Sequence, residues 1–291
     1  REEHLDLKEG LVTEVVAEEG HVTGVVTEKG VYYGARAVIL TTGVYMESAV
    51  VTGDSWKRAG RSGQLAAEGL AESLRDLGVE LGRFKTGTPP RIDKETVDFS
   101  QLEPQYGSEE PLAFSYMTEP ESREQLPCWL TYTNEDTHRL ILDNLYRAPL
   151  FDGSIETTGP RYCPSIETKV VRFEDKRKHQ VFLEPQGWDT NELYVLGMST
   201  SLPYDIQVNM LRTLPGLENV EVMRAGYAIE YDYVLPTQLR RSLECKIVRG
   251  LYCAGQINGS SGYEEAAGQG IMAGINARRQ LEGKEAVVLD R

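Results

Sequence analysis

The sequence predicts an α/β fold with a second, α+β domain inserted into it. A buried apolar run at residues 250–254 ends at a glycine-rich turn, and a helix of small residues follows. A second apolar run, residues 35–43, also ends at a glycine. Between these two runs the composition turns polar and acidic after residue 98, which indicates the insertion. A strand, a glycine turn and a helix N-terminus together form a platform for a polar, partly anionic ligand.

The composition limits the class of protein. With 291 residues, 40% of them apolar, the chain is long enough for one large domain or two smaller ones. No apolar run approaches the roughly 20 residues of a membrane helix, and the first residues are not a signal peptide. The four cysteines lie far apart, which predicts reduced thiols in a cytoplasmic protein, with no metal site and no membrane. The net charge of −14 argues against a surface that binds nucleic acid all over, but it leaves a local basic patch open.

The first 88 residues are predicted to belong to the α/β domain. Three β-rich stretches, residues 11–17, 21–28 and 31–38, predict an antiparallel meander punctuated by glycine turns. Residues 35–43 predict a strand that is buried on both faces. This order is typical of a flavin dinucleotide-binding domain after its opening βαβ unit. The GxGxxG of that unit does not occur in this sequence, so we interpret the chain as an excerpt of a longer protein.

The stretch from residue 43 to residue 93 contains one predicted helix between two segments of irregular composition. Residues 43–63 predict no regular element, and residues 64–77 predict an amphipathic helix that stops at Gly78. Residues 82–93 hold two prolines, two glycines and three basic residues, a composition that predicts no regular element. This loop is a rigid structural turn or an anion-binding arm, and the sequence does not decide between them.

Residues 89–217 are predicted to form the inserted domain. A helix capped by Thr133 or Asn134 covers residues 135–146. Residues 170–173 and 180–184 flank a charged turn, as in a hairpin, with a strand at 193–196 and a helix at 202–214 following. Residues 218–291 return the chain to the first domain. The last helix contains three glycines, which predict close packing on the sheet or on a cofactor.

Four motifs in order carry a resemblance to a known family. They are KTGTPPRID at 85–93, GPRYCPSIE at 159–167, GYAIEYD at 226–232, and GQING with GYEEAA at 255–267. On these residues the chain resembles the MnmG (GidA) family, whose FAD-containing members modify the wobble uridine of certain tRNAs. Family members are longer: they begin with the GxGxxG unit and end in a helical domain used for tRNA and for the partner GTPase, MnmE. The resemblance weakens between Asp54 and Glu72.

The resemblance implies a partial FAD-binding dinucleotide fold of the glutathione-reductase-like type with an inserted α+β NAD-binding domain. It implies FAD contacts at Val12, Gln256, Asn258, Gly259 and Gly262. It also implies an NAD-binding segment over residues 159–173, which includes Gly159, Pro160, Arg161, Tyr162, Ser165, Lys169 and Phe173. Cys163 matches one of two cysteines that the family needs for activity.

The implied reaction adds a carboxymethylaminomethyl group to C5 of the wobble uridine. It uses FAD, NADH and methylenetetrahydrofolate as the one-carbon donor, with glycine or ammonia as the amine, and a homodimer acting together with MnmE. Uridine C5 becomes nucleophilic when a thiolate adds at C6. Arg161 beside Cys163 favours such a thiolate. The alternative roles for Cys163 are general acid–base catalysis, redox chemistry and positioning.

Two other functions remain open at this point. One is a folate- and FAD-dependent tRNA uridine methyltransferase of the TrmFO type, and the other is a non-catalytic fragment that serves as a binding or assembly module. Residues 176–179 form a basic run that is either solvated or in contact with tRNA phosphates. The sequence predicts that His138 and His179 are solvated or paired surface groups. It also leaves Asp93 and Asp232 as candidates for proton transfer, and Glu264 or Glu265 as a residue that faces the flavin.

Overall fold

The computed structural model describes residues 3–122, 124–155, 157 and 164–290. An antiparallel meander opens the chain, with β1 (Val12–Glu18), β2 (His21–Thr27) and β3 (Tyr32–Gly34) in that spatial order. This confirms the three β-rich stretches. Short 3-10 turns punctuate the rest of the chain: η1 (Arg61–Gly63), η2 (Lys94–Thr96), η3 (Phe99–Gln101), η4 (Leu145–Arg147), η5 (Pro236–Gln238) and η6 (Gly255–Asn258).

Two short parallel strands and the last helix form the second layer. β4 (Val38–Leu40) pairs in parallel with β15 (Leu251–Cys253), and α5 (Glu264–Leu281) packs on β15 through Ala273 and Ala277. The prediction that β4 is buried on both faces is wrong, because the side chain of Ile39 is 37% exposed. A Cβ added at Gly268, Gly270 or Gly274 would meet nothing within 4 Å. The close packing expected of these glycines is therefore not made among the described residues.

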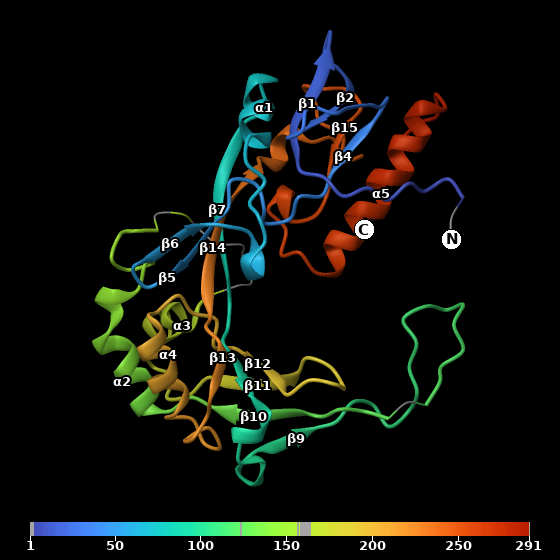
Figure 1. Ribbon diagram of the computed structural model, residues 1–291. Helices are drawn as coiled ribbons and strands as arrows, with labels where there is room; N and C mark the ends of the chain where they lie inside the picture. The colour runs from blue at the N-terminus through green and yellow to red at the C-terminus, as the bar shows by residue number, and fades with distance from the viewer. Residues whose placement is uncertain (1–2, 123, 156, 158–163, 291) are drawn as a thin grey trace.

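A long two-stranded ribbon connects the upper and lower parts of the molecule (Figure 1). β7 (Leu81–Thr88) pairs with β14 (Tyr227–Val234) over eight consecutive residues, in a sheet completed by β5 (Ala49–Thr52) and β6 (Ser55–Arg58). The predictions of irregular structure at 43–63 and 82–93 are therefore wrong. Pro89 and Pro90 do not disturb the strands, because they lie in the gap between β7 and β8 (Arg91–Asp93).

Helix α1 (Leu70–Asp76) is shorter than the predicted helix 64–77. It begins after Gly69, whose φ is +85°. The residues before it hydrogen-bond elsewhere: the amide of Ala67 donates to the carbonyl of Tyr45, and the amide of Gly60 donates to the carbonyl of Gln64. These contacts with an earlier segment outweigh the local helical pattern.

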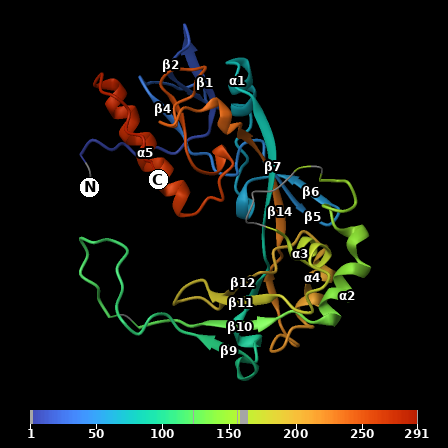
Figure 2. The ribbon, with the colours of Figure 1, turned by 180° about the vertical axis from the view of Figure 1, so that it is seen from behind.

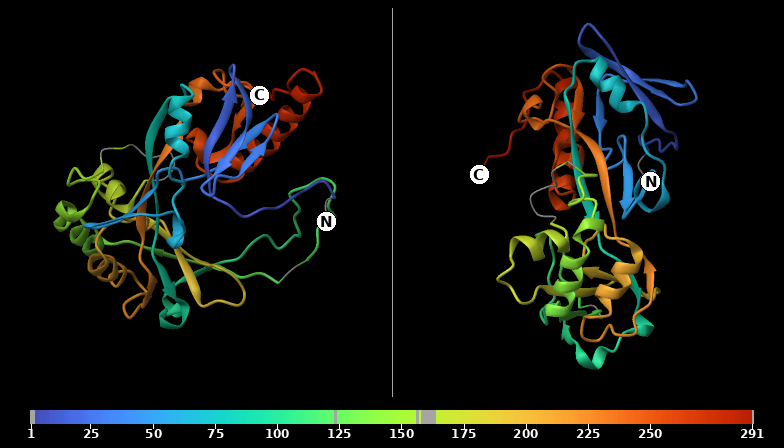
Figure 3. Two further views of the ribbon diagram at one scale, coloured as in Figure 1. Left: turned by 45° about the horizontal axis from the view of Figure 1, so that its top comes forward. Right: turned by 90° about the vertical axis from the view of Figure 1, so that its left-hand side faces the viewer.

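The inserted part is an antiparallel six-stranded sheet covered on one side by helices. Its strand order is β13-β8-β12-β11-β10-β9, with β9 (Glu103–Gln105), β10 (Cys128–Tyr132), β11 (Gln180–Pro185), β12 (Glu192–Leu196) and β13 (Val222–Arg224). The helices are α2 (Glu135–Asp143), α3 (Ile166–Arg172) and α4 (Tyr204–Leu211). They stand in front of the sheet in the right panel of Figure 3. The connection from β9 to β10 extends away from the sheet as a long arm (Figure 2).

The hairpin predicted around residues 174–179 is wrong. Residues 170–172 belong to α3, and β11 pairs with β10 and β12 instead. Ser165 caps α3, and Ile166, Glu167 and Val170 are buried at helical spacing. The β-branched pair Val170-Val171 therefore gave a misleading local signal for a strand.

The buried apolar residues form separate clusters. One cluster lies between the six-stranded sheet and its helices, and all its members fall between Ile92 and Val222. Another joins the meander, α1 and β15, with members from Val15 to Val79 and from Val234 to Ile257. β13 is part of the inserted sheet although it lies beyond residue 217. The domain division at 1–88, 89–217 and 218–291 stays a prediction.

Candidate functional site

The glycine turn after β15 has a backbone that only glycine tolerates. The φ angles are +86° at Gly255, +77° at Gly259 and +96° at Gly262, all in the left-handed region. A Cβ on Gly262 would lie 2.4 Å from Cδ of Gln256. The turn therefore folds back on the side chain of Gln256.

Side chains from α5 hold the turn in place. The amide of Gly255 and Nδ2 of Asn258 both donate to Oε1 of Gln269, each at 2.9 Å. The amide of Gly262 donates to Oε1 of Glu265 at 2.7 Å, and Ser261 donates to the same carboxylate. Glu265 thus anchors the turn to α5. Sequence reasoning missed Gln269, although its place four residues after Glu265 puts both on one face of the helix.

Three buried oxygens at this turn have no hydrogen-bond partner among the residues that the structure describes. They are Oγ1 of Thr42, Oδ1 of Asn258 and Oγ of Ser260. Thr42 follows β4, and a Cβ on the next residue, Gly43, would lie 3.9 Å from Oε1 of Gln256. The ends of both parallel strands therefore meet at the turn. An unpaired buried polar group costs about 1–3 kcal/mol, so this arrangement fits a polar ligand that completes the hydrogen bonds.

An aromatic pair connects the turn to the ribbon. The rings of Phe84 on β7 and Tyr233 on β14 stack with centroids 3.8 Å apart and planes 11° apart. A Cβ on Gly259 would lie 2.8 Å from Cε2 of Phe84. The turn thus rests directly on this stack, because Gly259 carries no side chain.

A buried charge network lies along the same ribbon. Oδ1 of Asp232 accepts from Nη1 of Arg83 at 2.9 Å, and Oδ2 accepts from Nη2 of Arg75 at 2.6 Å. Arg83 also lies 3.7 Å from Oε2 of Glu230. Asp232 is 5% exposed and engaged with two arginines, so the structure gives it a structural role rather than the proton transfer considered from sequence. Asp93 likewise caps η2 by accepting from the amide of Glu95.

The predicted NAD segment is described only in part. Gly159, Pro160, Arg161, Tyr162 and Cys163 lie outside the described residues. Of the remaining three, Lys169 lies in α3, and Ser165 and Phe173 are its N-cap and C-cap. Ser165 caps the helix by accepting from the amide of Thr168 at 3.3 Å, Nζ of Lys169 donates to the carbonyl of Gly197 at 3.1 Å, and Phe173 ends the helix with 45% exposure.

The structure does not bring α3 to the glycine turn. Figures 1 and 2 show α3 and α5 on opposite sides of the β7–β14 ribbon. A hydrogen bond of 2.9 Å from Oγ1 of Thr157 to Oε1 of Glu230 ties the chain just before the predicted NAD segment to β14. Val12, the remaining predicted FAD contact, packs against the cluster that contains Ile257 of η6.

Glu167 is a buried carboxylate that sequence reasoning did not single out. It is fully buried on α3, and Oε1 accepts from Oγ1 of Thr200 and from the amide of Ser201 at 3.3 Å. Its Oε2 has no hydrogen-bond partner within the described part of the chain. The residue therefore fastens α3 to the segment after β12.

His138 and His179, predicted to be solvated or paired surface groups, are paired and only partly buried. Their rings lie 5.2 Å apart, and Oγ1 of Thr133 contacts Nε2 of His138 at 2.7 Å. Partial burial lowers the pKa of both imidazoles, and the neighbouring His138, Lys169 and Lys176 lower the pKa of His179 further. The fold at this point therefore favours neutral histidines.

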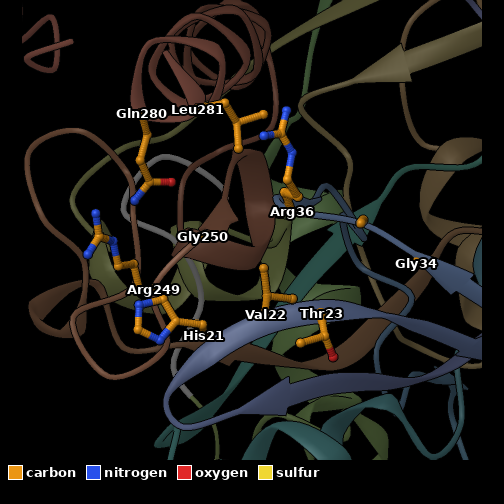
Figure 4. A pocket seen from close by; sticks show the side chains of 10 residues that line it. His21, Val22, Thr23, Gly34, Arg36, Arg249, Gly250, Gln280 and Leu281 are labelled. Atoms are coloured by element: carbon orange, nitrogen blue, oxygen red, sulfur yellow. The ribbon is translucent and has the colours of Figure 1, made fainter. Parts of the chain in front are cut away.

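A cavity of about 830 Å³ lies between the meander and the end of α5. Figure 4 shows Arg249 and His21 on one side of it and Arg36 on the other. None of its ten lining residues is acidic, and none of the predicted site residues lines it. It is therefore separate from the glycine turn.

The described cysteines are free thiols. Cys128 is partly buried, whereas Cys245 and Cys253 are buried. Burial raises the pKa of Cys253 to about 12, which makes it an unreactive core residue. Among the residues that the structure describes, three or more His, Cys, Asp or Glu side chains nowhere gather as a metal site, and none of the helices is long and apolar enough to cross a membrane.

These observations define a class of protein: an α/β protein that presents a glycine turn and a helix N-terminus at the carboxyl ends of parallel strands, where such folds bind polar ligands. The particular family follows from comparison with known proteins. The family described as Glucose inhibited division protein A matches residues 1–285, and the chain belongs to this GidA family.

Individual relatives agree with this assignment. The chain is 57% identical over 290 residues to the tRNA uridine 5-carboxymethylaminomethyl modification enzyme MnmG of Heliobacterium modesticaldum, and 56% identical over 291 residues to that of Bacillus subtilis. In each case it is covered completely but spans only 46% of the relative. The crystal structure of Aquifex aeolicus GidA (form I) superposes with a TM-score of 0.92 at 49% identity, covering 99% of this chain and 49% of that one.

Proposed function

We propose that this chain is the FAD- and NAD-binding part of an enzyme that installs a 5-carboxymethylaminomethyl group on uridine in tRNA. The observation that carries the proposal is the glycine turn with its three unpaired buried oxygens in a chain of the GidA family. The curated relatives bear the name of this activity. Because the chain spans less than half of their length, the activity belongs to the complete protein.

The glycine turn would hold FAD. Gln256, Asn258, Gly259 and Gly262 surround the position, with Thr42 and Ser260 offering hydroxyl groups and Val12 proposed as a further contact. FAD supplies two-electron redox chemistry when it is bound. The residues of this chain bind and orient it: the Phe84–Tyr233 stack supports the turn from below, and Gln269 and Glu265 fix the turn to α5.

The segment 159–173 would bind NADH, which restores the flavin to its working redox state. In the described part, Ser165 and Lys169 fix α3 and Glu167 fastens it to the segment after β12. Cys163 would act as the group that adds to C6 of the target uridine and makes C5 nucleophilic. Methylenetetrahydrofolate as the one-carbon donor, the GTPase MnmE as partner and a homodimer in the cytoplasm complete the proposal.

The decisive experiment uses the full-length protein. A flavin absorption spectrum is recorded anaerobically before and after addition of NADH or NADPH, and the tRNA of a deletion strain is analysed for the modified nucleoside with and without a complementing gene. We expect a stoichiometric flavin that NADH bleaches, and restoration of 5-carboxymethylaminomethyluridine. A Cys163→Ser protein that restores the nucleoside fully would contradict the role of Cys163. A protein without flavin would contradict the assignment of the turn.

A further inference from the structure

A glutamate on the ribbon holds the chain that leads into the predicted NAD segment. Glu230 lies on β14 and is 7% exposed. Its Oε1 accepts a hydrogen bond from Oγ1 of Thr157 at 2.9 Å, and the two residues are 73 positions apart in the sequence. Gly159, where the predicted NAD segment begins, follows two residues after Thr157. The carboxylate therefore contacts the chain at the point where it enters that segment.

Two cations lie on the same side of the ribbon as this carboxylate. Nη2 of Arg83 lies 3.7 Å from Oε2 of Glu230, and Lys85, which is 5% exposed, is directly opposite Glu230 in the strand register. Arg83 is itself held by Asp232 at 2.9 Å. A hydroxyl that donates to a carboxylate forms a stronger hydrogen bond than one between neutral groups. The oxygen that accepts from Thr157 thus belongs to a side chain with a fixed position.

An apolar contact supports the same stretch of chain. Ile155 is 5% exposed and packs in one cluster with Val51 of β5 and Ala228 of β14. Ala228 and Val51 are directly opposite each other in the register, and Ala228 precedes Glu230 by two residues, so these side chains point to the same side of the sheet. Ile155 and Thr157 therefore both rest on the side of the ribbon that carries Glu230.

The chain is fixed again where the segment enters α3. Ser165 caps this helix, and the amide of Ile166 donates to the carbonyl of Ser199, in the segment after β12, at 2.8 Å. The eight residue steps from Thr157 to Ser165 reach at most about 29 Å when they are fully extended. The two attachments belong to different parts of the fold, β14 before the segment and the inserted sheet after it. Removing the hydrogen bond at Thr157 therefore weakens one of the two attachments and leaves the other unchanged.

We propose that Glu230 is a positioning residue for the nucleotide-binding segment: through its hydrogen bond to Thr157 it fixes where this segment starts on β14. The inference rests on the proposed function for the identity of the ligand, which is NADH. It gives a role in binding to a residue of the GYAIEYD motif, to which the proposed function assigns none. The competing explanation is that Glu230 only stabilises the ribbon, and the tests separate the two.

The first test measures how tightly the full-length protein binds NADH. Flavin reduction is followed anaerobically over a range of NADH concentrations, which gives the Kd for NADH and the limiting rate separately. Thr157→Val removes the hydroxyl and keeps the shape, and Thr131→Val is the matched control, because Oγ1 of Thr131 donates to the carbonyl of Pro215 in the inserted part. We expect the Kd to rise about tenfold in Thr157→Val and in Glu230→Ala, the effect of losing one hydrogen bond to a charged group, and to stay unchanged in the control.

Two further variants separate positioning from stability. Glu230→Gln keeps an oxygen that accepts from Thr157, so it should raise the Kd less than Glu230→Ala does. Adding Thr157→Val to Glu230→Ala should raise the Kd no further, because both substitutions act on one contact. A residue that only stabilised the ribbon would lower the melting temperature and leave the Kd as it is. Kd values in Thr157→Val and Glu230→Ala equal to that of Thr131→Val would overturn the proposal.

The second test needs no NADH. Hydrogen–deuterium exchange is measured in the peptide that covers residues 155–166, in which the amides of Ile155 and Ile166 donate to backbone carbonyls. We expect faster exchange in Thr157→Val and unchanged exchange in Thr131→Val. Equal exchange in both overturns the proposal, even where Glu230→Ala fails to fold. If NADH does not reduce the flavin of the unaltered protein, the proposed function falls, and the exchange measurement still decides whether the contact between Glu230 and Thr157 holds this stretch of chain.

Discussion

At the scale of single residues, Gly262 allows the glycine turn to close on Gln256. Its φ is +96°, and an added methyl group would meet Cδ of Gln256 at 2.4 Å. We expect Gly262→Ala in the full-length protein to lose most of its flavin, measured as the ratio of flavin to protein absorbance. Gly30→Ala is the control, because Gly30 has a similar φ of +74° in open space and so carries the backbone strain alone. Equal flavin content in the two variants would contradict this view of the turn.

The His138–His179 pair predicts a pH dependence of stability. Burial lowers the pKa of both rings in the folded state, so the unfolded chain binds more protons. The stability is therefore fully present above the unfolded pKa of about 6.5 and is lost as the pH falls through the lower folded values. We expect the urea midpoint of the inserted part to fall between pH 7.5 and pH 5.5. The fall in the urea midpoint should be smaller in the double variant His138→Gln/His179→Gln. In His21→Gln, a control at an exposed position, the fall should be as large as in the unaltered protein.

At the scale of elements, the β7–β14 ribbon depends on its internal charges. Asp232→Ala would remove the buried carboxylate shared by Arg83 and Arg75 and leave Arg83 with Glu230 alone, at 3.7 Å, so we expect a loss of about 2–3 kcal/mol in the free energy of unfolding. Asp136→Ala removes an exposed partner of Arg139 and should cost less than about 1 kcal/mol. Chemical denaturation monitored by circular dichroism compares the two. If Asp232→Ala lowers the free energy of unfolding no more than Asp136→Ala does, the charge network does not stabilise the fold.

The elements also show where sequence reasoning succeeds. The meander, β15 and α5 follow from local patterns of alternation, glycine placement and helical spacing, and the glycine turn is local too. β7 was missed because its partner β14 lies about 145 residues further along the chain, and no local pattern records such a pairing. The same reason hides Thr42, which reaches the turn from a distant segment, whereas Gln269 carried a local signal in its helical spacing from Glu265. Only the folded chain brings Thr42 to the turn.

At the scale of the whole molecule, the presence of separate apolar clusters predicts that each cluster unfolds in a transition of its own. Leu183 belongs to the cluster of the inserted sheet and Leu74 to the cluster beneath the meander, and both are fully buried. Replacing either leucine by alanine should lower the free energy of unfolding of its own cluster by about 2–5 kcal/mol. We expect two transitions in chemical denaturation, with Leu183→Ala lowering the midpoint of one and Leu74→Ala that of the other. A single transition shifted by both substitutions would show that the clusters unfold as one unit.

The ribbon between these clusters also restricts how they move. Its eight residue pairs alternate between an aromatic side, with Phe84 and Tyr233, and a charged side, with Arg83 and Asp232. A slip by one residue would exchange the two sides and bury charges under the glycine turn, so sliding is excluded. The ribbon can still bend and twist. The ribbon therefore fixes the spacing of the two clusters along the strands, and their relative orientation can change only as these strands bend or twist.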